Sequence, residues 1–464
     1  MARGSRAVVS LSILTYPLEN RNQETECVNL ITERKKKTDV SYGEEDKISN
    51  LPEHLTDLIL ERLPIEDAVK TNIISKKWRY RWTKMRVLVF DDQFSKKFAK
   101  NGAFGRNGFI RIIIQVLTFH KGPILKFYLH IPNIVLDSFQ EVDQFMLLLS
   151  RNSVTDLVLT NSNKRYKLPS HVYSCLELRK LDLENCFFKP PLDFEGFLNL
   201  EELLFENIDF GARLCGAKIN LPQLKKLCLE TCTKVYNFNI KAIKLRNLTV
   251  IACHDAMLLR LLDSPCLFDV VISLQKPMQN FVRVEKMNLA TVLSSLPKVR
   301  KFCIDSHFLK FLSTEEIPKL LPCELGSLRH LWLLDFELGD LDQLHGALCL
   351  IRNSPNLESL HMHMLRVQEA RVDVGPASDH LESPNCLDGT LNRLETVDMK
   401  YLEGSRAELL FLKLLLAYSP FVEEITITPR GVLDALKILD IAKDVMLFPR
   451  ASSKVKIMLL NPER

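Results

Sequence analysis

Two pairs of neighbouring residues have side chains that could do chemistry. Cys253 is followed directly by His254, the two residue types that form a thiol nucleophile and its general base. His361 and His363 alternate, so on a β-strand both imidazoles would lie on one side and could share a metal ion. Adjacent residues of a strand face opposite sides, however, and the sequence places no third ligand near the histidines. We therefore predict neither a catalytic cysteine nor a metal site.

Other signatures of catalysis or cofactor binding are missing from the sequence. It contains no G-x-x-x-x-G-K-[ST], G-x-S-x-G, H-E-x-x-H or G-x-G-x-x-G. Its 12 cysteines are scattered, and Cys228 and Cys232 have no companion pair that would complete a zinc site. We predict a protein with no catalytic residues, metal or cofactor, located in a reducing compartment, the nucleus or the cytoplasm.

Composition and charge narrow the class of partner. The chain has 464 residues, of which 46% are hydrophobic and 26% charged, as in a soluble globular protein. A net charge of +5 is small for this length, so a nucleic-acid partner is disfavoured. No run approaches 18 apolar residues, so we expect no membrane-spanning helix and no membrane partner.

Residues 46–82 contain three short helical patterns. Pro52 is tolerated in a first helical turn, and Pro64 ends the pattern that follows it. The apolar residues of this first pattern recur at helical spacing: Leu55, Leu58, Ile59 and Leu63. A second run has Ala68, Val69, Ile73 and Ile74 on one apolar side. A third begins at Ser75, a predicted N-cap, and stacks Trp78, Trp82 and Met85. So short a module needs a partner or the following domain to be stable.

Many positions of this stretch carry the residue types of one known family. They are Asp46, Ile48, Ser49, Leu51, Pro52, Leu55, Ile59, Leu60, Leu63, Pro64, Asp67, Ala68, Val69, Thr71, Ser75, Trp78, Arg79 and Trp82. In this order they closely resemble a plant-type F-box. The resemblance implies a three-helix module that binds a Skp-type adaptor, and through it a cullin and a RING protein, in a ubiquitin ligase. The residues expected to contact the adaptor are Leu51, Pro52, Leu55, Ile59, Leu63 and Val69.

The rest of the chain repeats one apolar spacing. Three apolar anchors, the second three residues after the first and the third two residues after the second, occur twelve times. The units begin at Ile124, Val154, Leu178, Leu200, Leu224, Leu245, Leu267, Val299, Leu328, Leu357, Leu394 and Val422. Intervals between the units from Val154 to Leu267 lie in the leucine-rich-repeat range of roughly 20–29 residues. Later intervals are longer and indicate insertions.

Stacked units of this kind predict an α/β fold, a leucine-rich-repeat solenoid with a parallel sheet on its concave side. Alternate residues of each strand would point into a shared core, and those between them would line the concave side. The predicted contacts to a protein substrate on that side are Trp332, His330, His361, His363, Asp182 and Asp398. Alternatively, the protein's own loops would cover the exposed Trp332 indole, and the sequence favours neither this arrangement nor substrate binding. Cys186, Cys232 and Cys253 occupy the turn after a strand, where we expect small buried groups.

Segments between and after these features are less regular. Residues 87–92 read as a strand, residues 101–108 as a flexible loop, residues 110–119 as a helix or a strand, and residues 369–390 as a loop or boundary. The last 80 or so residues alternate strand-like and helix-like patterns, and the phrase at 448–454 resembles the FBD domain of many plant F-box proteins. The predicted domains are a disordered segment (1–45), an F-box (46–86), the repeat array with a linker at its start (87–383) and the FBD domain (384–464).

Together these resemblances identify the chain as a member of the plant F-box/FBD/leucine-rich-repeat family. They imply the substrate-recognition subunit of a Skp-cullin-F-box-type ubiquitin ligase, which catalyses nothing itself and holds a target protein near the ubiquitin-loading subunits. The alternative is a leucine-rich-repeat interaction scaffold whose F-box no longer recruits a ligase. Binding of the chain to a Skp-type adaptor separates the two.

Overall fold

The computed structural model describes residues 51–99, 102–133, 139–211, 218–235, 238–253, 264–276, 289–312, 324–365, 376–382, 387, 391–431 and 433–461. The predicted disordered segment 1–45 lies outside these residues, as does His254. All helices and strands described below belong to the compact unit that begins at Glu53. Among the described residues, no helix is long and apolar enough to cross a membrane.

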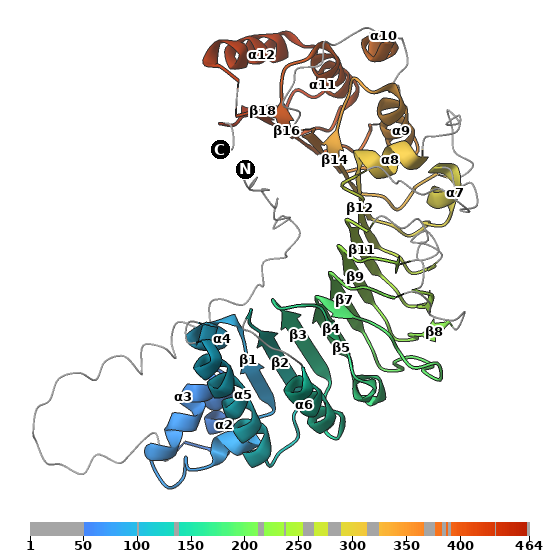
Figure 1. The fold of residues 1–464 in the computed structure, drawn as a ribbon. Coiled ribbons are helices and arrows are strands. Elements are labelled where there is room, and N and C mark those ends of the chain that lie inside the picture. The colour runs from blue at the N-terminus through green and yellow to red at the C-terminus, as the bar shows by residue number, and fades with distance from the viewer. Residues whose placement is uncertain are drawn as a thin grey trace, which may run out of the picture. The chain divides into compact units, whose positions relative to one another are not determined.

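A single sheet of 14 strands, each parallel to its neighbours, runs through this unit in chain order (Figure 1). Its strands are β1 (Val87–Phe90), β2 (Lys126–Ile131), β3 (Asp156–Asn161), β5 (Lys180–Glu184), β7 (Glu202–Glu206), β9 (Lys226–Glu230), β11 (Asn247–Ile251), β12 (Asp269–Ser273), β13 (Lys301–Asp305), β14 (His330–Phe336), β15 (Ser359–Met364), β16 (Thr396–Leu402), β17 (Glu424–Pro429) and β18 (Lys456–Leu459). Two further pairs, β4 (Tyr166–Lys167) with β6 (Cys186–Phe187) and β8 (Ile219–Asn220) with β10 (Ile240–Lys241), lie outside it. The predicted α/β solenoid is confirmed.

Each of the twelve predicted repeat units supplies one strand, from β2 to β17. All of their anchors are buried, none with more than 3% of its surface exposed. The second anchors of successive units are register partners, as Leu181, Leu203 and Leu227 show. Because one unit cannot cover its own apolar side, this alignment is what closes the core.

The strand predicted at residues 87–92 is confirmed as β1, and it belongs to a further unit that the twelve predicted units did not include. Met85, Leu88 and Phe90 have the same spacing as the other anchors, and all three are buried. The carbonyl of Arg86 accepts hydrogen bonds from the next unit, from the N–H groups of Leu125 (2.8 Å) and Lys126 (3.0 Å). Equivalent paired hydrogen bonds recur along the sheet. The last residues of the F-box-like stretch therefore lead directly into the first strand.

Two loop predictions are wrong. Residues 102–108, predicted as a flexible loop, form the start of α5 (Gly102–Phe119), which settles residues 110–119 as helix. Their three glycines suggested a loop, but α4 (Asp92–Ala99) packs against α5, with the rings of Phe94 and Phe109 5.7 Å apart. Burial thus outweighs the cost of glycine in this helix. Within the predicted loop 369–390, residues 376–382 form α10 (Pro376–Glu382).

Helices and short turns return the chain from one strand to the next on the buried side of the sheet. The return elements are η4 (Ser170–Ser174), α6 (Gln140–Ser150), α7 (Leu289–Ser294), α8 (Ser306–Leu312), α9 (Leu341–Arg352), α11 (Arg406–Tyr418) and α12 (Ala435–Leu447). At several strand ends one residue has a left-handed backbone, among them Asn185 (φ 55°) and Thr231 (φ 51°). The side chain after it, Cys186 or Cys232, is buried, as is Cys253, which confirms the structural role predicted for these three thiols.

The C-terminal residues have the predicted alternation of strands and helices. β16, α11, β17, α12 and β18 follow in order, and their strands continue the same sheet. Ser405 and Glu408 form a capping box that starts α11, which satisfies backbone N–H groups at the helix N-terminus. Gly404, just before it, has φ +75°, and a Cβ there would lie 2.7 Å from the Ile441 side chain on α12. Only glycine allows α12 this close approach.

Candidate interaction surfaces

The F-box-like stretch has an inner side that packs on the start of the sheet. Its elements are α2 (Glu53–Glu61), α3 (Ile65–Lys70), η2 (Thr71–Ile73) and η3 (Arg81–Lys84). The side chains buried on the inner side are Thr56, Leu60, Ile65, Ala68, Thr71, Trp78, Trp82 and Met85. Arg81 ties η3 to α2 through Glu53 Oε1 (3.1 Å) and Asp57 Oδ1 (3.0 Å). This clasp fixes a module that is too short to be stable alone.

The third helix, predicted to begin at Ser75, is wrong: the chain there forms turns and a short 3₁₀ helix. Ser75 is not an N-cap: its buried hydroxyl accepts no hydrogen bond from the described part of the chain, and residues 76–80 form turns instead of an α-helix. Only the short 3₁₀ helix η3 follows. The left-handed backbone of Tyr80 (φ 64°) separates the two, and a left-handed residue cannot continue an α-helix. Trp78 and Trp82 are nevertheless buried.

The outer side of this module leaves large apolar side chains in contact with solvent. Of the predicted adaptor contacts, Pro52 and Leu55 are exposed, and the others are half-buried: Leu51, Ile59, Leu63 and Val69. The most exposed apolar side chains of the module were not on that list: Leu58, Ile73, Ile74 and Tyr80. Ile73 is 89% exposed. Helical periodicity placed Leu58 and the two isoleucines on apolar sides, but it could not tell an inward side from an outward one.

The face of the sheet away from the return elements carries the predicted substrate contacts. Register pairing puts Trp332, His361 and Asp398 side by side on β14, β15 and β16. The Trp332 and His361 rings stack with centroids 4.7 Å apart and planes 3° from parallel. His330 lies at the near edge of this stack, with its ring centroid 5.8 Å from that of Trp332. Trp332 is therefore covered in part by neighbouring imidazoles of the same sheet.

A chain of polar contacts holds the His361 ring parallel to the indole. Thr396 Oγ1 donates to Ser359 Oγ (2.9 Å), and Ser359 Oγ lies 2.7 Å from His361 Nε2. On the other side of the ring, His361 Nδ1 lies 3.5 Å from Asp398 Oδ2. Ser359, His361 and Asp398 contact one another in the order of a hydrolase catalytic triad. In such an enzyme the backbone N–H of the serine is free to bind the substrate oxyanion, but the Ser359 N–H donates to the carbonyl of Arg329 (2.9 Å). This amide therefore cannot stabilise an oxyanion, and the contacts serve to orient the ring.

His363 and Asp182 lie apart from this stack. His363 contacts the ring of Tyr401, with centroids 6.1 Å apart. Asp182 lies on β5, many strands away, in a row of the same face that reads Tyr128, Val158, Asp182, Leu204 and Cys228. The six predicted contacts thus share one face of the sheet without forming one site. Across the described residues, no group of three His, Cys, Asp or Glu side chains could hold a metal ion.

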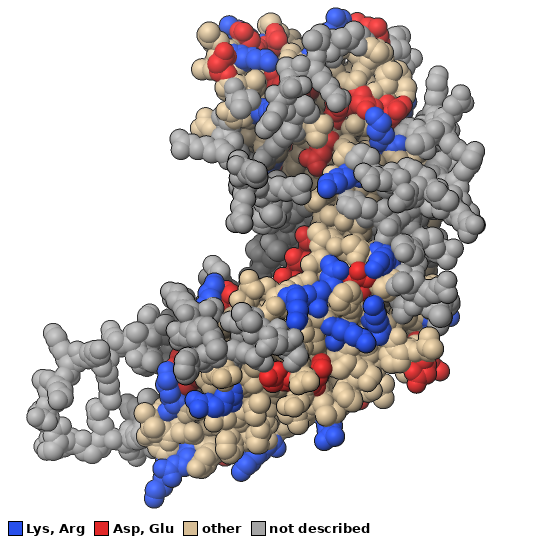
Figure 2. Space-filling model, viewed as in Figure 1, with Lys and Arg blue, Asp and Glu red and all other residues tan. Residues whose placement is uncertain are grey.

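A ladder of acidic side chains lies beside Asp182. Glu184, Glu206 and Glu230 are register partners on β5, β7 and β9. Glu206 keeps an exposed surface, and partial desolvation together with the neighbouring charges of Glu184 and Glu230 raises its pKa. Burial raises the pKa of Asp182 despite the nearby Lys180. Like charges at this spacing disfavour ionisation. Elsewhere on the drawn face both signs of charge are interspersed (Figure 2).

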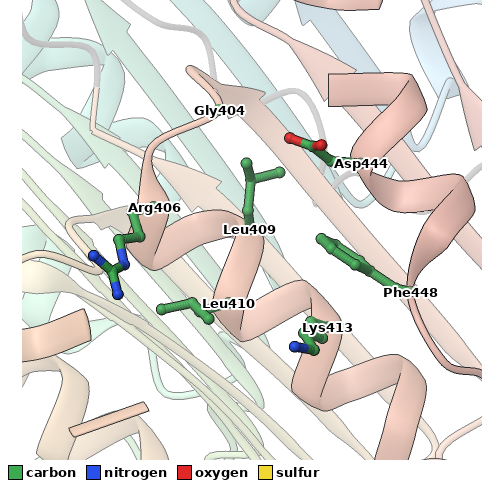
Figure 3. A pocket seen from close by; sticks show the side chains of 7 residues that line it. All are labelled: Gly404, Arg406, Leu409, Leu410, Lys413, Asp444 and Phe448. Carbon is green, nitrogen blue, oxygen red and sulfur yellow. The ribbon is translucent and has the colours of Figure 1, made fainter. Parts of the chain in front are cut away.

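A shallow hollow of about 370 Å³ lies between α11 and α12 (Figure 3). Its lining is mostly apolar, and Leu409 and Phe448 approach each other across it. Arg406 and Lys413 lie on the α11 side, and Asp444 on the α12 side. Arg406 already pairs with Glu382 of α10.

The fold and these surfaces define a leucine-rich-repeat-like solenoid that carries a helical module at its start. The family model of the F-box domain matches residues 48–90. An F-box/FBD/LRR-repeat protein of Arabidopsis thaliana is 29% identical over 423 residues, which cover 90% of this chain and 99% of that protein. A second is 30% identical over 47% of this chain and 50% of its own, and a putative third is 24% identical over 78% and 84%. The chain thus carries an F-box domain, and its relatives over most of its length are plant F-box/FBD/LRR-repeat proteins.

Proposed function

We propose that the protein is the substrate-recognition subunit of a Skp-cullin-F-box-type ubiquitin ligase, acting in the nucleus or the cytoplasm. The observation that carries the proposal is the apolar outer side of the F-box, uncovered by the described part of the chain, in a module that the F-box family model matches. The protein itself performs no bond chemistry. It would hold a target protein close to the ubiquitin-loading subunits, so that transfer becomes effectively intramolecular.

The Skp-type adaptor would cover the outer side of the F-box. Its predicted contacts are Leu51, Pro52, Leu55, Ile59, Leu63 and Val69, and we add the exposed Leu58, Ile73 and Ile74. Fully burying one such side chain stabilises a complex by about 1.5–3 kcal/mol before association costs. A few such residues suffice for a stable complex, since few residues dominate most interfaces.

The substrate would bind the open face of the sheet. Its π-stacked Trp332 and His361, held by Ser359 and Asp398, form a rigid platform. A rigid aromatic anchor loses little conformational entropy when it binds, which is why such residues dominate interfaces. We propose that Trp332, His330, His361 and Asp398 contact the substrate together, and that Asp182 and His363 contribute separately.

Co-purification with a Skp-type adaptor tests the proposal. We expect the intact chain to retain the adaptor and a Leu58→Asp/Ile74→Asp variant to lose it, because both charges would be buried unpaired. The Leu51→Ala/Pro52→Ala pair should weaken the complex too. A Leu198→Asp variant is the matched control, since Leu198 is similarly exposed but lies in the array. If the intact chain fails to bind, the interaction-scaffold alternative replaces the proposal.

Affinity capture of stabilised partners tests the substrate surface. The same protein should be captured by the intact chain and by an F-box deletion, and it should be lost from a Trp332→Ala variant of either. Ile114→Ala, an exposed apolar residue on α5, is the control. Capture that is insensitive to Trp332→Ala, Asp398→Asn and His361→Ala would place substrate binding elsewhere.

A further inference from the structure

Helix α12 is apolar on two opposite sides. Ile441 and Val445 are buried against the rest of the unit. Four large side chains on the opposite side are exposed: Leu436, Leu439, Met446 and Leu447. Because a helix turns once in 3.6 residues, these positions form a single stripe along it. An amphipathic surface helix has one apolar stripe, so the second one requires a partner.

Helix α12 lies at the end of the solenoid, between β17 and the last strand, β18, in the chain (Figure 1). β18 has no described neighbour beyond β17, and its exposed Leu459 is the register partner of the buried anchor Ile427, on the side of the sheet that the return helices cover. Its hydrogen bonds run to the β17 side, as from the N–H of Leu460 to the carbonyl of Ile427 (2.8 Å). Alternate backbone groups therefore point to the free edge.

The charges within the stripe discriminate between possible occupants. Lys443 lies in the middle of the stripe and pairs with Asp440 (3.1 Å) at its margin. A purely apolar partner would bury this exposed ion pair without any further polar contact, which is costly. A second α12 packed antiparallel about a twofold axis between Ile441 and Ala442 brings Asp440 of each copy opposite Lys443 of the other. The same axis places Leu436 opposite Leu447.

We propose that the chain self-associates through α12, as an isologous dimer in which two copies of this helix pack antiparallel. The Leu436–Leu447 and Asp440–Lys443 pairings are each self-complementary, which is what a twofold axis requires. Such a dimer would present two F-boxes and two open sheet faces, so that each assembly binds its partners bivalently.

Sedimentation velocity of the full chain over a range of concentrations tests the dimer. We expect the wild-type chain to sediment as a dimer that dissociates on dilution. Asp440→Lys should raise the dissociation constant about tenfold or more, because it places like charges opposite each other. The double variant Asp440→Lys/Lys443→Asp restores the opposite-charge pairing and should return the constant to within about threefold of wild type.

Two further variants separate a specific effect on the α12 interface from a general effect of an added surface charge. Leu439→Lys should abolish the dimer, whereas Leu198→Lys, at a similarly exposed site in the array, should leave it intact. All these positions are exposed, so each variant should keep the wild-type melting temperature at a concentration at which every protein is monomeric. A monomeric wild-type chain at every concentration would overturn the proposal, and so would a dimer that Leu439→Lys and Asp440→Lys leave unchanged.

Discussion

The repeat array buries all of its predicted apolar anchors, whereas the F-box module leaves several of its apolar side chains exposed to solvent. In the array every predicted anchor is buried, and the polar residues between anchors face solvent. In the module, Leu55 and Leu58 on α2 face solvent, whereas Thr56 and Leu60 face the interior. An array completes its core with copies of itself. A module with an uncovered apolar side needs another protein, so the same kind of residue stabilises the fold in one region and serves binding in the other.

Truncating an anchor of the array should have the largest effect. Leu227→Ala leaves a cavity in the middle of the sheet core and should lower the free energy of unfolding by about 2–5 kcal/mol. Leu58→Ala in the module should change it by less than about 0.5 kcal/mol. Thermal and urea denaturation of the two variants measures the difference. Similar losses from both would remove the contrast between the regions.

Backbone strain in the array should come next. Gly196 has φ +137°, and a Cβ there would collide with the backbone of Asn220 in the next return segment. Gly196→Ala should cost about 1–3 kcal/mol of unfolding free energy. Gly326→Ala is the control, because its Cβ would meet open space. A Gly196→Ala variant as stable as that control would show that successive units can move apart at this point.

The clasp of the F-box should matter less to global stability and more to binding. Arg81→Met removes the ion pairs to Glu53 and Asp57, so it should cost about 1 kcal/mol locally. We expect faster amide hydrogen exchange in α2 and weaker adaptor binding, with little change in the melting temperature of the array. Lys70→Met, which removes an exposed pair with Asp67, is the control. Equal amide hydrogen exchange in α2 of the two variants would contradict the stabilising role of the Arg81 ion pairs.

The acidic ladder should give the smallest effect, and its sign depends on pH. Because partial desolvation and like charges raise the pKa of Glu206, the folded state holds its proton more readily than the unfolded state. Its contribution to stability is present below the ordinary glutamate pKa and is lost as pH rises through the folded value. Glu206→Gln should therefore raise the melting temperature by about 1 °C at pH 7. The gain should vanish at pH 4, and Glu177→Gln should show none at either pH.

The sequence predicted the repeat array better than the F-box module, because the array buries its anchors in a regular pattern and the module has both a buried and an exposed apolar side. The anchor spacing located twelve strands, because three buried side chains per strand leave a pattern that composition alone cannot produce. It missed the first unit, since Met85 had been assigned to a helix. The three glycines at the start of α5 led to the wrong prediction of a loop, because it is packing against α4 that makes a helix favourable at these residues. In the F-box, periodicity found the helices but not which apolar side faces inward.

The sequence by itself determined the repeat, its period, the turn cysteines and the resemblance to the F-box, because these depend on residues close together in the chain. Only the tertiary structure decided which side chains meet. Trp332, His361 and Asp398 come from three units whose spacing carries no information about how their rings and charges contact one another. The outer stripe of α12 likewise became visible only once Ile441 and Val445 had filled the inner side. Register between distant strands is a property of the assembled sheet, and the candidate sites depend on it.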